Sequence, residues 1–148
     1  SPFQPESVSI DAGRLMLKRI RELLNSNQDF SFETTLATKT FVHIIDEAHS
    51  KGYHISLIFF WLDSPDLAKD RVRKRVSEGG HNIEEKVIER RYLAGIKNLF
   101  EIYWNKLDSL VIFDNSGIES DLIYEKDFNK KPITHNPEKF EKLKSISK

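Results

Sequence analysis

The sequence contains no cysteine, and this absence excludes several kinds of site. Disulfide bonds, cysteine nucleophiles and the usual zinc clusters all require thiols. The five histidines have no metal-ligand spacing, and His81, in a glycine-flanked stretch, is more typical of a loop histidine than of a general base. We therefore predict no metal site made wholly from protein ligands. A chain without cysteine also suits a reducing compartment, so we expect a cytoplasmic location.

Net charge and long apolar runs are also missing. Lysine plus arginine and aspartate plus glutamate each number 23, so no overall field attracts nucleic acid or an anionic membrane. No apolar segment approaches the roughly 20 residues that span a bilayer, and the chain does not open with a signal-peptide pattern. We expect a globular protein that binds neither nucleic acid nor membrane. Its 148 residues, 39% of them hydrophobic, suit one domain.

Glycine is scarce, and the six glycines do not form a phosphate-binding loop. They are Gly13, Gly52, Gly79, Gly80, Gly95 and Gly117. The pattern Gly-x-x-x-x-Gly-Lys-Ser/Thr, which aligns successive backbone amides on one anion, is not found in this sequence.

Helical and strand-like segments alternate along the chain. The periodicity predicts helices over residues 5–25, from Phe41 until Gly52, from Ser64 to Gly79, over a segment ending near Trp104, and in "NPEKFEKLKS". The apolar run "ISLIFFWL" (55–62) predicts a strand buried on both faces, and "SLVIF" predicts another. Phe30–Phe32 is expected to be a short strand, and "DLIY" an antiparallel edge strand. This alternation predicts an α/β domain with a mostly parallel sheet.

Polar residues follow three of the predicted strands, where α/β folds bind ligands. These residues are Glu33, Thr34 and Thr35; Asp63 and Ser64; and Asp114, Asn115 and Ser116. Thr35, Ser64 and Ser116 could instead only cap helices or turns. Asp63 resembles a magnesium-binding aspartate after an apolar strand, although Ser64-Pro65 equally suits a helix entry. Glu33 could orient a hydroxyl or a metal-bound water at this rim, or it could belong only to a helix cap, and both interpretations remain open.

A basic cluster occupies two consecutive predicted helices. Its members are Arg71, Arg73, Lys74 and Arg75 on the first, and Arg90 and Arg91 on the second. Arg71 and Arg75 share a helix face, and like charges so placed repel unless an anion lies between them. Phosphate would fit, because the forked arginine side chain binds two phosphate oxygens together. The alternative is a solvated face paired with Asp66, Asp70, Glu84, Glu85 and Glu89.

Several segments together resemble one protein family. "AGRLMLKRIREL", "FSFETTLATKT", "GYHISLIFFWLDSPDLAKDRVRKRVSEGGHNI", "ERRY" and "VIFDNSG", in this order, resemble the zeta-toxin-like P-loop kinases, also described as predicted ABC-type ATPases, over about residues 1–125. The resemblance implies an adenylate-kinase-like fold. It also implies transfer of the γ-phosphate of ATP or GTP, with Mg²⁺, to a small-molecule hydroxyl. The characterised toxins use UDP-N-acetylglucosamine, and an antitoxin is a conceivable partner.

The resemblance also implies roles for individual residues. Phosphate-holding catalytic arginines would be found among Arg71, Arg75, Arg90 and Arg91. The acceptor site would be lined by Arg14, Glu33, Thr34 and Thr35. Asp114 and Asn115 would lie near the nucleotide base. We expect residues 1–128 to form the kinase domain, incomplete at its N-terminus, and residues 129–148 to form a lysine-rich tail or helix.

The family pattern begins with a part that this sequence does not contain. Its members open with a strand, a glycine-rich phosphate loop and a helix, and then a strand carrying the presumed aspartate base. The resemblance thus implies the C-terminal portion of a three-layer parallel fold whose central phosphate-loop strand is missing. The strands at Phe30–Phe32 and residues 55–62 would then pair directly, recruit another segment or chain, or keep open edges. Pairing of open edges between copies would give a homo-oligomer.

Three hypotheses for function follow. The first is the C-terminal part of a small-molecule kinase. As an isolated chain, this part would be catalytically inactive and would bind no cofactor. The second, from another class, is a non-catalytic module that binds a phosphorylated ligand or a protein partner. The third is an enzyme whose N-terminal piece is a separate chain.

Overall fold

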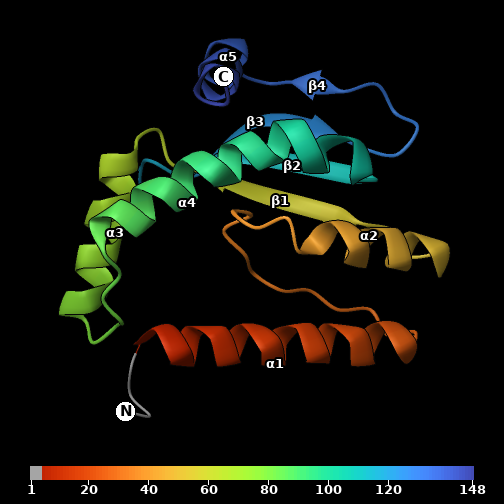
Figure 1. Ribbon diagram of the computed structural model, residues 1–148. Coiled ribbons are helices and arrows are strands. Elements are labelled where there is room, and N and C mark those ends of the chain that lie inside the picture. Colours follow the sequence, from red (N-terminus) through yellow and green to blue (C-terminus); the bar gives the residue numbers. More distant parts are fainter. Residues whose placement is uncertain (1–4) are drawn as a thin grey trace. The chain divides into compact units, whose positions relative to one another are not determined.

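A computed structural model describes residues 5–148 of the protein (Figure 1), and residues 1–4 lie outside the described part. The chain divides into two compact units. The first ends at Glu33, and the second comprises Thr34–Lys148. Within residues 5–148, the first unit contains one α-helix, and the second contains a four-stranded sheet and the other four α-helices.

The helix of the first unit has the predicted bounds. Helix α1 spans Pro5–Asn25, and proline at its first position suits a turn whose N–H groups have no helical partner. The chain leaves the helix through Asn27, which has a positive φ of 56°. The N–H of Gln28 then donates to the Leu23 carbonyl at 3.2 Å. This left-handed residue closes the helix end as a C-terminal cap usually does.

The strand predicted at Phe30–Phe32 is wrong. Residues 28–35 have no strand conformation in the structure, and the apolar residues there belong to a segment without regular secondary structure. A strand needs a neighbouring strand to bond its N–H and C=O groups. A segment of three residues makes too few contacts to be stable as a strand unless a neighbouring strand is already in place.

The sheet of the second unit is mixed, in the order β1-β2-β3-β4. Strand β1 (Ser56–Trp61) pairs parallel with β2 (Ser109–Asp114), which pairs antiparallel with β3 (Asp121–Lys126). Strand β4 (Ile133–Thr134) pairs antiparallel with β3. The α/β class is confirmed, but the mostly parallel sheet is not. The connection from β2 to β3 is a short turn, and such a turn can join only antiparallel strands.

The side chains on the two faces of the sheet differ in solvent exposure. Trp61, Leu110 and Ile112 point to one face and are at most 1% exposed. On the other face Phe60 is 58% exposed and stacks on Phe113, with ring centroids 5.7 Å apart. Strand β1, in addition, has no hydrogen-bonded neighbour beyond β2 among the described residues. A long edge strand without charged or proline residues is one that proteins usually cover.

The helices of the second unit follow their predicted patterns. Helix α2 (Phe41–Ser50) buries Phe41, Ile44, Ile45 and Ala48, and Gly52 follows with φ 84°. Helix α3 (Pro65–Ser77) is capped by Ser64, whose hydroxyl accepts from the Leu67 N–H. Helix α4 (Glu85–Asn98) continues as a π-helical turn (Leu99–Tyr103) and a 3₁₀ turn (Trp104–Lys106). Helix α5 spans Pro137–Ile146, after Asn136 as its cap.

An aromatic cluster attaches helix α5 to the rest of the second unit. Phe140 of α5 stacks on Tyr124 of β3, with centroids 4.5 Å apart and planes 8° apart. Phe100 and Trp104, from the turns after α4, pack against the same phenylalanine. Leu143, one turn later in α5, is completely buried. The C-terminal helix is therefore part of the core of this unit.

Among the described residues, no helix is both long and apolar enough to cross a bilayer.

Candidate functional site

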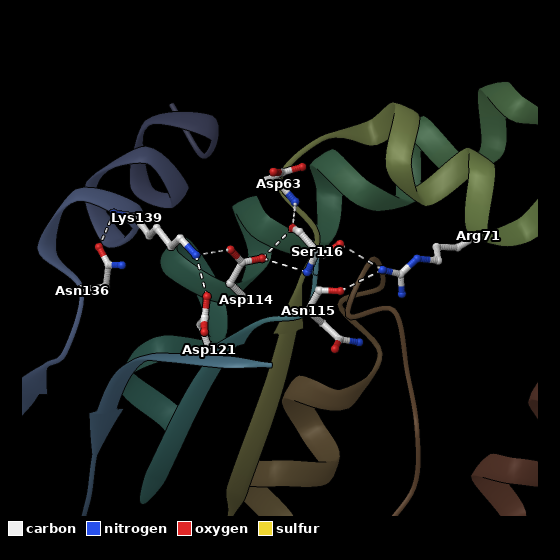
Figure 2. A network of polar contacts seen from close by, with 8 residues as sticks. All are labelled: Asp63, Arg71, Asp114, Asn115, Ser116, Asp121, Asn136 and Lys139. Carbon is white, nitrogen blue, oxygen red and sulfur yellow. Dashed lines mark hydrogen bonds and ion pairs between the residues drawn. The ribbon is translucent and has the colours of Figure 1, made fainter. Parts of the chain in front are cut away.

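The carboxyl ends of β1 and β2 are joined by a polar network (Figure 2). Asp114 ends β2, and its Oδ1 accepts bonds from the Ser116 N–H at 3.0 Å and the Ser116 hydroxyl at 2.5 Å. The same hydroxyl oxygen accepts the N–H of Asp63, just after β1, at 2.9 Å. Ser116 is thus a bridge between two strand ends. Topology alone predicted that these ends would share a rim, and the structure brings them together.

Asp114 is a buried carboxylate held by a cation from the C-terminal helix. Its Oδ2 lies 2.8 Å from Lys139 Nζ, which also contacts Asp121 at 2.9 Å. Burial raises the pKa of Asp114, but the bonds from Lys139 and Ser116 outweigh it and lower this pKa below its usual range. The Lys139 pKa is raised by the hydrogen bonds that its ammonium group donates to Asp114 and Asp121. Both groups are therefore charged at neutral pH.

Arg71 joins helix α3 to the same turn. Its Nη2 donates to the Asn115 carbonyl at 3.0 Å and to the Ser116 carbonyl at 3.2 Å. A guanidinium has five N–H donors, and these two bonds use one nitrogen. The remaining donors of Arg71 can still meet a ligand. The turn at Asn115 and Ser116 therefore sets where the guanidinium points.

A pocket of about 400 Å³ opens beside this arginine. It is lined by Phe60, Leu62, Arg71, Lys74, Arg75, Glu78 and Asn115. Among the described residues, no acidic side chain forms an ion pair with Lys74 or Arg75. Three cations beside one carboxylate and an aromatic face make a site suited to an anionic ligand with an apolar or planar part.

The opposite face of α3 fits the alternative interpretation, a solvated ion-paired surface. Arg73 contacts Asp70 at 2.6 Å and also forms an ion pair with Glu85. Lys69 lies 3.1 Å from Glu89 of α4, which ties the two helices together. Exposed pairs of this kind contribute little to stability. The predicted basic cluster is thus divided, with Arg71 and Arg75 turned to the pocket and Arg73 to the acids.

The other predicted arginines are not part of this pocket lining. Arg90 of α4 is exposed and Arg91 is half-buried. Asn115 lines the pocket, whereas Asp114 is not in the lining and instead accepts a hydrogen bond from Ser116 in the adjacent turn. Ser64 caps α3, as one of the two interpretations predicted, and His81 is an exposed loop residue.

The segment that begins the second unit is held tightly against α4. A side chain at Gly95 would place its Cβ closer than 3.0 Å to the Thr35 carbonyl oxygen. Asn98, which is buried, donates from Nδ2 to the Leu36 carbonyl at 2.9 Å. Leu36 itself has a φ of 63°, unusual for a residue with a branched side chain. One turn later, the Tyr103 hydroxyl donates to the Thr38 carbonyl at 2.6 Å.

The hydroxyls of Thr34 and Thr35 organise this segment rather than cap a helix. Thr34 Oγ1 accepts the Leu36 N–H at 3.1 Å, and Thr35 Oγ1 accepts the Ala37 N–H at 3.4 Å. Both residues are exposed. Helix α2 begins later, after Thr40, which makes no side-chain cap bond. Arg14 and Glu33 belong to the first unit, and their place in an acceptor site stays a prediction.

Phe60 and Lys139 were not predicted to contribute to the site. Phe60 lines the pocket because the second face of β1 is exposed, although the apolar run suggested burial on both faces. Lys139 lies 25 residues after Asp114 in the sequence, and no local pattern connects the two. Lys74 was recognised as part of the basic cluster but not as a pocket residue. The described residues contain no group of three or more histidine, aspartate or glutamate side chains suited to a metal.

One family model matches most of this chain. The family described as Zeta toxin matches residues 4–127. An uncharacterized protein of Haemophilus influenzae is 26% identical over 92 residues, which cover 62% of this chain. The match spans 66% of the length of that relative. No solved structure matches the chain.

Proposed function

The chain belongs to the zeta toxin family, and from this we propose that it is the C-terminal part of an ATP- or GTP-dependent kinase. The acceptor would be a hydroxyl of a small molecule, with a nucleotide sugar as the expected class. The observation that carries the proposal is the pocket beside α3, where Arg71, Lys74 and Arg75 converge at the ends of two strands. In phosphoryl transfer, catalysis consists mainly of positioning the substrates and stabilising negative charge.

The pocket residues fit the phosphate groups of a nucleotide. Arg71 is oriented by the carbonyls of Asn115 and Ser116 and keeps donors for phosphate oxygens. Lys74 and Arg75 add positive charge to the lining, and Phe60 offers an aromatic face to a planar group. When bound, a nucleoside triphosphate with Mg²⁺ would supply the transferable phosphoryl group. The phosphates and water would provide most Mg²⁺ ligands, as is usual for this ion.

The acceptor side would be formed by the segment that α4 holds. Thr34 and Thr35 are exposed and fixed by local hydrogen bonds, which suits hydroxyls that orient a ligand. Glu33 and Arg14, which belong to the first unit, stay candidates for contact with the acceptor, as the family resemblance implies. Arg90 and Arg91 are the remaining candidates for phosphate contact on α4.

The phosphate cradle would come from outside the printed sequence. Three cations on one helix do not reproduce the row of backbone amides that a glycine-rich loop supplies. Strand β1 pairs with β2 alone among residues 5–148, and this edge and its exposed face support completion by a strand at that position. That strand could be encoded upstream or lie in a separate chain. A second copy of this chain could also pair with this edge.

The second candidate function is a module that binds a phosphorylated ligand without catalysis. It is favoured by the combination of a basic pocket with no phosphate-loop motif in the sequence. Both candidates predict anion binding, so only phosphoryl transfer distinguishes them.

Anion binding is tested by titrating the chain with pyrophosphate at low salt, followed by NMR. We expect weak binding, with Arg75→Ala reducing the affinity by roughly fivefold, which corresponds to about 1 kcal/mol for one partly exposed charged bond. Arg73→Ala is the matched control, because this arginine lies on the same helix but pairs with Asp70 and Glu85. Equal losses in the two variants would contradict the pocket.

The kinase hypothesis is tested on the full gene product. The reading frame upstream of the codon for Ser1 is sequenced, and the complete protein is assayed for transfer of labelled γ-phosphate to nucleotide sugars. An in-frame glycine-rich loop and transfer that falls in Arg75→Ala would support the kinase. A start codon close to Ser1, with pyrophosphate binding but no transfer, would instead support the non-catalytic module.

A further inference from the structure

We propose that Lys139 is a positioning residue, which fixes the Asn115–Ser116 turn and through it the pocket arginine Arg71. This inference rests on the proposed function, because it gives a role to the same pocket. Lys139 and Arg71 lie on opposite sides of Asp114 (Figure 2). It also lies after residue 127, where the match to the zeta toxin family ends.

The two oxygens of Asp114 have separate partners. Lys139 Nζ binds Oδ2 at 2.8 Å, and Ser116 binds Oδ1 through its N–H and hydroxyl. The side chain of Asp114 is 7% exposed, so its charge has little help from water. Without the lysine, this buried carboxylate would protonate or rotate towards another donor. In either case Oδ1 would no longer hold Ser116 in the same place.

The turn transmits this position to the pocket. The carbonyls of Asn115 and Ser116 are the acceptors of Arg71 Nη2, and both belong to the turn that Asp114 closes. The Ser116 hydroxyl also accepts the Asp63 N–H at the end of β1. A displaced turn would therefore move the guanidinium relative to Lys74 and Arg75.

Lys139 is itself held from three directions. Its N–H donates to the Asn136 cap at 3.1 Å, and its Nζ has Asp121 as a second partner at 2.9 Å. Phe140, the next residue, is stacked on Tyr124. The first turn of α5 is thus a rigid support for the ammonium group rather than a mobile tail.

The test compares Lys139→Met with Lys144→Met by NMR and pyrophosphate titration. Lys144 is a matched control, since it lies on the same helix, over the Phe140 ring and beside Glu141, and outside the network. We expect Lys139→Met to shift the amide signals of Ser116 and Asp63 and to weaken pyrophosphate binding roughly threefold to tenfold, the range for one misplaced charged contact. Lys139→Arg should keep most of the affinity.

A double-mutant cycle keeps the inference testable if Lys139→Met folds poorly. Asp114→Asn removes the buried charge, so Lys139→Met added to it should cause little further change in amide signals or affinity. Full additivity, or wild-type signals and affinity in Lys139→Met, would overturn the inference. If the wild-type chain does not bind pyrophosphate, the proposed pocket is wrong, and the Ser116 and Asp63 signals alone decide whether Lys139 holds the turn.

Discussion

Replacing Gly95 by alanine should destabilise the protein, although the same change in an ordinary helix stabilises it. Alanine is favoured over glycine inside a helix by about 1 kcal/mol. At Gly95, however, the new Cβ would lie closer than 3.0 Å to the Thr35 carbonyl oxygen, a separation that real Cβ atoms essentially never show. Either α4 or the segment around Thr35 must move.

The size of the effect follows from what holds that segment. Overpacking a tight contact costs about 1–3 kcal/mol, and a weakened Asn98–Leu36 hydrogen bond adds about 1 kcal/mol. Leu36, at φ 63°, has little freedom to absorb the movement. After subtracting the helix preference of alanine, the unfolding free energy should fall by about 1–3 kcal/mol.

Urea unfolding followed by far-UV circular dichroism measures this change. Gly13→Ala is the matched control, because Gly13 lies in α1 and a Cβ there would meet no atom within 4 Å. That variant should equal the wild type or gain up to about 1 kcal/mol. A Gly95→Ala protein as stable as the wild type, or more stable, would refute the close approach of α4 to Thr35.

Three further results are expected. Tyr103→Phe leaves the Thr38 carbonyl without its partner and should lower the unfolding free energy by about 1 kcal/mol, measured by urea unfolding, whereas an unchanged value would show that water replaces the hydroxyl. Because the folded-state pKa of Asp114 is lowered, the stability that its carboxylate contributes is present above the unfolded pKa and is lost as the pH falls through the folded pKa. Asp114→Asn should therefore lose less stability than the wild type between pH 5 and pH 3, which lie about one unit on either side of the unfolded pKa. Parallel acid-unfolding curves for the two proteins would argue against this. Under the proposed kinase function, Glu33→Gln in the complete protein should lower kcat, and unchanged turnover and acceptor affinity would remove Glu33 from the site.

Local patterns predicted most of the elements and the antiparallel direction of β3, but they placed β3 at the edge of the sheet, whereas it lies between β2 and β4. The helices α1, α2 and α3 and strands β1 and β2 carry their periodicity and end signals in neighbouring residues. Phe30–Phe32 has the composition of a strand, yet whether a strand forms depends on a neighbour that the local sequence does not specify. The short β2–β3 turn made the sheet mixed, which the apolar pattern of β1 could not indicate.

The site was predictable where topology decides it and unpredictable where distant side chains do. Parallel pairing of β1 and β2 places Asp63 and Asp114 at one rim whatever the other contacts are. The division of the basic cluster depends on which acids of α4 face α3, and helical spacing alone does not settle this. Lys139 reaches the rim only because the aromatic cluster docks α5 beside β3. A lysine in the first turn of a helix gives no sign of such a role.

Calorimetry of this chain with ATP, with and without Mg²⁺, tests most directly whether the chain has a phosphate-binding pocket but no phosphate-binding loop. The account predicts weak binding that is not strengthened by Mg²⁺ and that is weakened by Arg75→Ala but not by Arg73→Ala. Micromolar binding that requires Mg²⁺ would contradict it, because these residues would then form a complete nucleotide site.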